Sequence, residues 1–164
     1  MAVIGTPGTI ASGAYQSALQ AIAPHISVKA KACPLFVPLA EEGWVEGDVP
    51  RLVAERYLDA VFLEGVDTLV LGCTHYPLLR DVIQRVVGPQ VRLVDSALAT
   101  AEHVASLLAG QHAEANPVQH HYLVTDTPAR FLDVAARFLG QPIQEVEQID
   151  LALAAPPPNH TTSS

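Results

Sequence analysis

Short apolar runs alternate with longer amphipathic stretches along most of this chain, and that alternation limits the folds open to it. The apolar runs predict buried strands, and the amphipathic stretches predict helices. Strand followed by helix, repeated this often, predicts an α/β fold with a mainly parallel sheet and helices on both faces. The expected strands are 2–5, 27–32, 67–71, 91–94, 121–125 and 143–146. The expected helices are 10–23, 50–65, 77–87, 96–109 and 128–139, and 34–43 is ambiguous.

Composition agrees with that fold and excludes several functions. Hydrophobic residues make up 49% of the chain but aromatic residues only 5%, which suits helices packed on a buried parallel sheet. Acidic residues outnumber basic ones by 17 to 9, which argues against non-specific nucleic-acid binding. No apolar run reaches the roughly 18 residues of a membrane span, and no secretory signal opens the chain. We therefore expect neither a nucleic-acid nor a membrane partner.

The chain contains two cysteines, Cys33 and Cys73. Two are too few for a disulfide scaffold, and their spacing matches no zinc motif. We therefore expect reduced thiols in a cytoplasmic protein.

Loops that follow the predicted strands are the expected place for a site, because ligands of parallel α/β folds bind beyond the carboxyl ends of strands. Three such loops carry turn or polar residues: Gly5–Thr9, Gly72–Tyr76 and Asp95–Ser96. The second of them carries the sharpest chemical signal.

Cys73 directly follows the apolar strand expected at 67–71. A helix expected to begin near Pro77 turns its free N–H groups toward this loop, and their partial positive charge stabilises a thiolate or a ligand carboxylate. Thr74 adds a hydroxyl, and His75 adds an acid or base. This set suits proton abstraction next to a carboxylate. Spacing alone leaves a second interpretation open, in which the cysteine is an inert buried residue and the histidine a surface or capping group.

Other polar motifs favour structural interpretations. Gly5–Thr9 lacks the lysine and the spacing of a phosphate-binding loop, so a plain strand-to-helix turn is favoured, although it could line a cleft. His120 and His121, with His103 or His112, could be imagined as metal ligands. Solvated surface histidines are the favoured interpretation, and we expect no metal.

The segment Gly72-Cys-Thr-His-Tyr-Pro-Leu-Leu79 resembles the second cysteine signature of glutamate racemases. Further patterns similar to that family occur in order over about residues 2–151. They are Val3–Thr9 with Ser12 and Tyr15, Ala32–Leu39 with Glu41, Glu42 and Gly43, Val94–Ala97, Val124–Asp126 with Phe131, and Phe138–Gly140.

This resemblance implies interconversion of L- and D-glutamate without a cofactor, by two cysteines on opposite faces of the substrate Cα, for peptidoglycan synthesis. By the resemblance, Cys73 is one base, His75 assists it and also contacts substrate, and Thr74 binds the substrate carboxylate or amine. Glu41 or Glu42 is expected near the site. His75 favours glutamate as substrate, because aspartate racemases usually carry a carboxylate there and hydantoin racemases lack the Thr-His pair.

The sequence also departs from the family. The Asp-Ser-Gly and Cys-Asn-Thr motifs of the family's first lobe do not occur, and Cys33 lies in a pattern that the family treats as structural. The resemblance implies a second lobe at 1–95, a segment returning to an incomplete first lobe at 96–153, and a disordered Pro-rich and polar tail at 154–164.

An incomplete lobe exposes a sheet edge and apolar faces, so low solubility, a homodimer or a missing partner chain is expected. We expect this chain alone to be inactive as a racemase. The alternative is a non-catalytic ligand-binding or interaction fragment of a racemase-like protein.

Overall fold

The computed structural model describes residues 1–110 and 119–151, and contacts divide the chain into two units after Glu114. The predicted tail at 154–164 lies outside the described residues, and the predicted boundary between 95 and 96 stays a prediction. In the described part, no helix has the length and apolar character that crossing a membrane requires.

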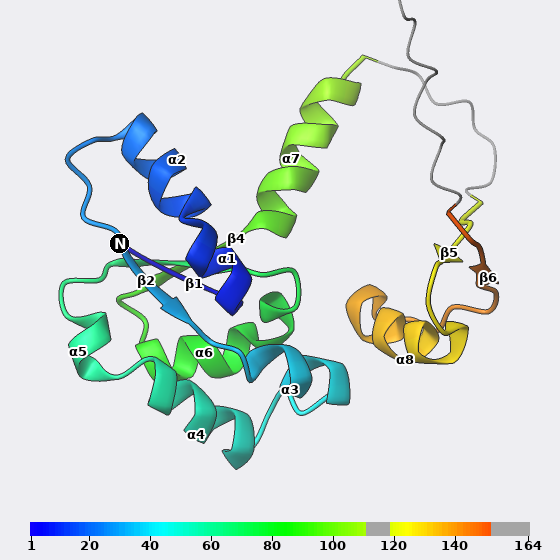
Figure 1. Ribbon diagram of the computed structural model, residues 1–164, viewed down its shortest axis with the longest axis horizontal. Coiled ribbons are helices and arrows are strands. Elements are labelled where there is room, and N and C mark those ends of the chain that lie inside the picture. Colours follow the sequence, from blue (N-terminus) through cyan, green and yellow to red (C-terminus); the bar gives the residue numbers. More distant parts are fainter. Residues whose placement is uncertain (111–118, 152–164) are drawn as a thin grey trace, which may run out of the picture. The chain divides into compact units, whose positions relative to one another are not determined.

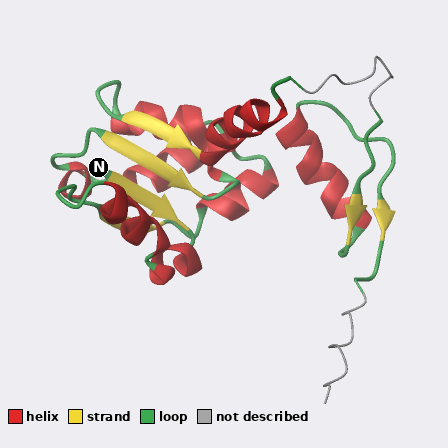
Figure 2. Ribbon diagram, turned by 90° about the horizontal axis from the view of Figure 1, so that it is seen from above, coloured by secondary structure: helices red, strands yellow, loops and turns green. Residues whose placement is uncertain are grey.

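The first unit is built on a parallel sheet, seen with its strands side by side in Figure 2. Its strand order is β2 (Lys29–Ala32), β1 (Ala2–Gly5), β3 (Thr68–Gly72) and β4 (Arg92–Asp95). Gly5 of β1 lies opposite both Ala32 and Gly72, so the carboxyl ends of three strands meet at one edge. The predicted α/β class with a parallel sheet is confirmed.

Helices cover both faces of this sheet. Figure 1 shows α1 and α2 on one side, and α3, α4 and α6 on the other. The helices of the first unit are α1 (Pro7–Ser12), α2 (Ala14–Ile22), α3 (Phe36–Glu42), α4 (Asp48–Tyr57), α5 (Ala60–Leu63), the 3₁₀ helix η1 (Tyr76–Leu79), α6 (Arg80–Val87) and α7 (Ser96–Leu108).

Two predicted helices are each divided in two. The stretch 10–23 breaks at Gly13, which adopts a left-handed conformation with φ of 65° that ends α1. The stretch 50–65 breaks before Asp59, whose Oδ1 accepts a hydrogen bond of 2.8 Å from Phe62 N and so starts α5. Amphipathic spacing carries across both breaks, which is why the pattern alone predicts continuous helices.

The core lies between the sheet and the α3–α6 layer, and aromatic rings hold its centre. The Phe36 ring makes edge contacts with Tyr57 and Tyr76 at centroid separations of 5.3 and 5.2 Å. The buried Tyr76 hydroxyl donates a 2.8 Å hydrogen bond to the carbonyl oxygen of Cys33. Burial raises the pKa of Tyr76, so this hydroxyl stays a donor.

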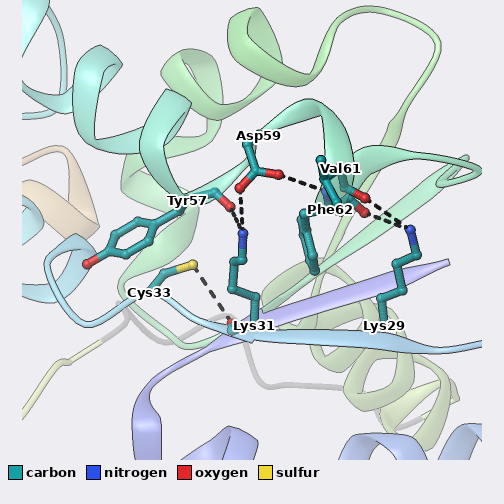
Figure 3. A network of polar contacts seen from close by, with 7 residues as sticks. All are labelled: Lys29, Lys31, Cys33, Tyr57, Asp59, Val61 and Phe62. Atoms are coloured by element: carbon teal, nitrogen blue, oxygen red, sulfur yellow. Dashed lines mark hydrogen bonds and ion pairs between the residues drawn. The ribbon is translucent and has the colours of Figure 1, made fainter.

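Two lysines of the edge strand β2 bind groups at the end of α4 and around α5. Figure 3 shows Lys29 on the carbonyls of Val61 and Phe62, and Lys31 on Tyr57 and Asp59. Lys29 Nζ donates to the carbonyl of Glu64 at 2.7 Å. Lys31 Nζ donates to the carbonyl of Tyr57 at 2.6 Å and to Asp59 Oδ2 at 3.0 Å. Cations are favourable near the free carbonyls at a helix C-terminus, and lysines on an edge strand also discourage pairing with another chain.

The second unit contains β5 (Leu123–Val124), α8 (Pro128–Leu139) and β6 (Glu147–Gln148), with β5 and β6 parallel. The helix matches its predicted bounds. The strand predicted at 143–146 is wrong, because the strand that pairs with β5 begins only at Glu147, just after the predicted strand ends. Ile143 and Val146 are half-buried but three residues apart, whereas one face of a strand takes every second residue.

We predict that Phe36→Ala lowers the free energy of unfolding of the first unit by about 3–5 kcal/mol, because it leaves a cavity between two aromatic rings. Urea unfolding followed by fluorescence of Trp44, the only tryptophan in the chain, measures the change. Leu52→Ala is the control: Leu52 is 54% exposed, and its loss should change stability by no more than about 0.5 kcal/mol. Equal losses in the two variants would contradict this description of the core.

Candidate active site

The candidate site begins where β1 and β3 end side by side. A Cβ on Gly72 would lie 2.9 Å from the carbonyl oxygen of Ile4 and 3.0 Å from Cε2 of Tyr15. Only glycine therefore allows this approach of the two strands and the Tyr15 ring. The close pairing brings the residue after Gly72 out of the sheet at its carboxyl edge, and that residue is Cys73.

Cys73, Thr74 and His75 form the turn between β3 and η1. Cys73 is a free, partly buried thiol, and Thr74 is exposed. Thr74 Oγ1 lies 3.3 Å from His75 Nδ1. The structure thus places the predicted residues on one turn and leaves the Cys73 side chain partly accessible, as a reacting group requires.

The helix predicted at 77–87 starts differently from expectation. It consists of the 3₁₀ turn η1 followed by α6, which begins only at Arg80. Pro77 occupies the first turn of η1, and tight 3₁₀ turns are frequent at helix starts. Tyr76, the first residue of η1, is fully buried and anchors the turn that carries the candidate site.

Glu41, near the end of α3, approaches the same turn from another element. Its Oε1 lies 3.4 Å from His75 Nε2, and the two side chains are 25% and 24% exposed. The imidazole therefore contacts a carboxylate at Nε2 and the hydroxyl of Thr74 at Nδ1. Because a carboxylate only accepts, a hydrogen bond here needs the proton on Nε2. Of the two acidic residues that the sequence offered, Glu41 makes the contact, and Glu42 is exposed.

Cys33 occupies a different environment from Cys73. It is fully buried, and its Sγ lies 3.8 Å from the carbonyl oxygen of Lys31. Burial raises the pKa of the Cys33 thiol to about 12, although the charge of Lys31 opposes the shift. The thiol therefore stays protonated and inert at neutral pH, in agreement with its predicted structural role.

Comparison with known proteins places this arrangement in a family. Residues 1–104, which include every residue of the candidate site, match the family model described as Asp/Glu/Hydantoin racemase. The chain belongs to this racemase family.

Relatives and solved structures of the racemase family are similar over most of this chain. A glutamate racemase of Geobacter metallireducens is 51% identical over 152 residues, which are 91% of this chain and 56% of the relative. The glutamate racemase structure from Francisella tularensis, in complex with D-glutamate, superposes with a TM-score of 0.81 at 36% identity. That match covers 91% of this chain and 57% of the other.

A second solved structure of a glutamate racemase also superposes on this chain. The Thermus thermophilus glutamate racemase, in complex with beta-chloro-D-alanine, has a TM-score of 0.77 at 40% identity and covers 92% of this chain. The racemase-family chain described here thus spans little more than half the length of the curated relatives it matches.

The other two strand-end loops of this racemase-family chain have structural roles. Thr6 Oγ1 accepts from Thr9 N at 3.3 Å and caps α1, so Gly5–Thr9 forms a strand-to-helix turn. Asp95 caps α7 through hydrogen bonds of 3.1 and 3.2 Å and also binds Arg80 Nη1 at 3.0 Å. The contact of Asp95 with Arg80 had no sequence signal.

His103, His120 and His121, which were considered as metal ligands, lie within the described residues. Within 1–110 and 119–151, no group of three or more histidine, cysteine or acidic residues could hold a metal ion. The His120 ring instead stacks on Tyr122 at a centroid distance of 6.1 Å. His112 lies outside the described residues.

We predict that iodoacetamide alkylates Cys73 in the native chain and spares Cys33. Only a thiolate attacks the reagent, and a thiol with a pKa of about 12 stays protonated. Raising the pH from 7 to 9 should therefore not label Cys33. Peptide mass spectrometry locates the label. A Cys73→Ser control should stay unlabelled until urea unfolds it, and native labelling of both cysteines at equal rates would contradict the assignment.

Proposed function

We propose that this chain supplies one half of a glutamate racemase active site, with Cys73 as the base for one face of the substrate. The observation that carries the proposal is a partly exposed Cys73 at a strand end, on the same turn as a histidine that contacts both Thr74 and Glu41. Two findings support the proposal: the chain belongs to the racemase family, and several of its relatives are named glutamate racemase.

The proposed reaction moves two protons between sulfur and carbon. The Cys73 thiolate takes the α-proton, so an S–H bond forms while the C–H electron pair stays on Cα. A second thiol then gives its proton to the opposite face, which inverts the carbon and leaves that sulfur as the thiolate. In the reverse direction Cys73 donates. Because the cycle uses only proton transfer, it needs no cofactor.

The second thiol must come from outside this sequence. Cys33, the other cysteine, is buried with a pKa raised to about 12, and it cannot supply a thiolate at neutral pH. A second polypeptide segment therefore completes the site, in agreement with the relatives' greater length.

We assign supporting roles to the neighbours of Cys73. Glu41 orients the His75 ring, and His75 stabilises the Cys73 thiolate or exchanges its proton. The exposed hydroxyl of Thr74 binds the substrate carboxylate or amine. D-Glutamate as a peptidoglycan precursor, and a cytoplasmic location in which thiols stay reduced, belong to the same proposal.

A second candidate is a non-catalytic fragment that binds a ligand or another chain. It is favoured by one observation, the match to only 56% of the relatives' length. Racemisation by the completed enzyme described in the last prediction below would favour the racemase proposal, and its inactivity would favour this alternative.

We predict negligible racemisation of L-glutamate by this chain alone. Absence of one general acid–base group costs about 10²–10⁴-fold in rate, and missing substrate contacts add to the loss. Chiral chromatography of glutamate after incubation measures the D-isomer. Substantial racemisation by a pure preparation whose mass matches this sequence would refute the two-cysteine proposal.

We further predict that Glu41→Gln slows a completed enzyme, made by adding the part of the Geobacter metallireducens relative that this chain does not match. Loss of the carboxylate releases the His75 ring, so kcat should fall roughly ten- to a hundredfold, less than removal of a general base. The KM should change little, and the pH profile of kcat should shift. Glu42→Gln is the matched control, because Glu42 is exposed. Equal effects of the two substitutions would remove Glu41 from the mechanism.

A further inference from the structure

The strand ends beside the candidate site lack side chains of their own. Gly5 ends β1 and Gly72 ends β3, and the two glycines are register partners. A glycine in a strand has no side chain to pack, so it weakens the strand at that point. The end of β3, which Cys73 follows, therefore depends on groups that other elements supply.

Side chains of α1 and α2 fill the space that these glycines leave. A Cβ on Gly5 would lie 3.1 Å from Cγ2 of Thr9, which belongs to α1. A Cβ on Gly72 would lie 3.0 Å from Cε2 and 3.3 Å from Cζ of Tyr15, which belongs to α2. Both contacts lie on the face of the sheet that α1 and α2 cover (Figure 1). An aromatic ring over a strand glycine restores the packing that the strand lacks.

The break between α1 and α2 brings Tyr15 to this position. Gly13 ends α1 in a left-handed conformation, and Ser17 N donates to the Gly13 carbonyl at 3.0 Å to begin α2. Tyr15 thus lies in the first turn of a new helix, where its side chain is half-buried although no residue of α2 is fully buried. The ring is therefore a main contact of α2 with the end of β3.

The core holds the same strand end from the opposite face. Cys73 packs against the buried cluster that contains Phe36 and Tyr76, and Tyr76 N donates to the Cys73 carbonyl at 3.2 Å. Successive residues of an extended chain face opposite sides of a sheet. The step from Gly72 to Cys73 is thus enclosed between the Tyr15 ring on one face and the aromatic core on the other.

We propose that Tyr15 is a positioning residue for Cys73. Its ring packs on Gly72, fixes the point at which β3 ends, and so sets the direction in which the turn of Cys73, Thr74 and His75 leaves the sheet. Ring carbons make the contact, so an aromatic ring is required and the hydroxyl is not. The catalytic consequence rests on the proposed function, whereas the effect on the turn does not.

The first test measures hydrogen exchange of this chain by mass spectrometry, in a peptide that spans residues 71–76. Tyr15→Ala removes the ring, so the strand end should open locally and exchange in this peptide should rise about tenfold or more. Tyr15→Phe keeps both contacting carbons and should retain the slow exchange of the unchanged chain. Tyr15→Leu replaces Tyr15→Ala if the latter does not fold, because leucine ends short of Cε2 and Cζ but stays apolar.

Leu19→Ala is the matched control on the same helix. Leu19 is half-buried one turn beyond Tyr15, on the same face of α2, and it is not among the closest neighbours of Gly72. Its loss should leave exchange in the 71–76 peptide unchanged. The proposal is overturned by unchanged exchange after removal of the ring, by an equal rise in Leu19→Ala, or by a rise that Tyr15→Phe shares.

The second test uses the completed enzyme described under the proposed function. Misplacing a reacting group lowers its rate more than it weakens binding, so Tyr15→Leu should lower kcat about tenfold and change the KM little. Tyr15→Phe should restore kcat. An unchanged kcat in Tyr15→Leu, or a raised KM alone, contradicts a positioning role. Inactivity of the completed enzyme with Tyr15 in place contradicts the proposed function, and hydrogen exchange then still decides the role of Tyr15.

Discussion

The close pairing of β1 with β3 at Gly5 and Gly72 is the constraint on which the candidate site depends. At Gly72 a side chain would collide with the backbone of Ile4 and with the Tyr15 ring, so the strands approach only because none is present. That approach ends β3 at the carboxyl edge of the sheet, where parallel α/β folds bind ligands. Cys73 is the first residue beyond it.

A second constraint holds the turn after Cys73 in place. Tyr76 is buried beneath it, donates a hydrogen bond to the backbone of Cys33 and packs against Phe36, the first residue of α3. The turn and α3 are thereby joined through the core, and the far end of α3 presents Glu41 to His75. The two cysteines differ in environment: burial suppresses ionisation of Cys33, whereas the strand end leaves Cys73 partly accessible.

Sequence patterns predicted elements more accurately than their bounds. The strands of the first sheet and the helix 128–139 were located, because short apolar runs and the Pro128–Gly140 pair are local signals. Both long helices were predicted without their breaks, since amphipathic spacing carries across Gly13 and Asp59. The last strand was misplaced, because its position depends on hydrogen bonds to a strand more than twenty residues away rather than on its own composition.

The sequence by itself determined the α/β class, the family resemblance and the presence of Cys73, Thr74 and His75 on one strand-end loop, because each is written in consecutive residues. Only the tertiary structure decided that Glu41 rather than Glu42 contacts His75 and that Cys33 is buried in the core. Those facts concern groups far apart along the chain. Burial and pairing arise when separate elements pack together, and no local pattern encodes which neighbours they meet.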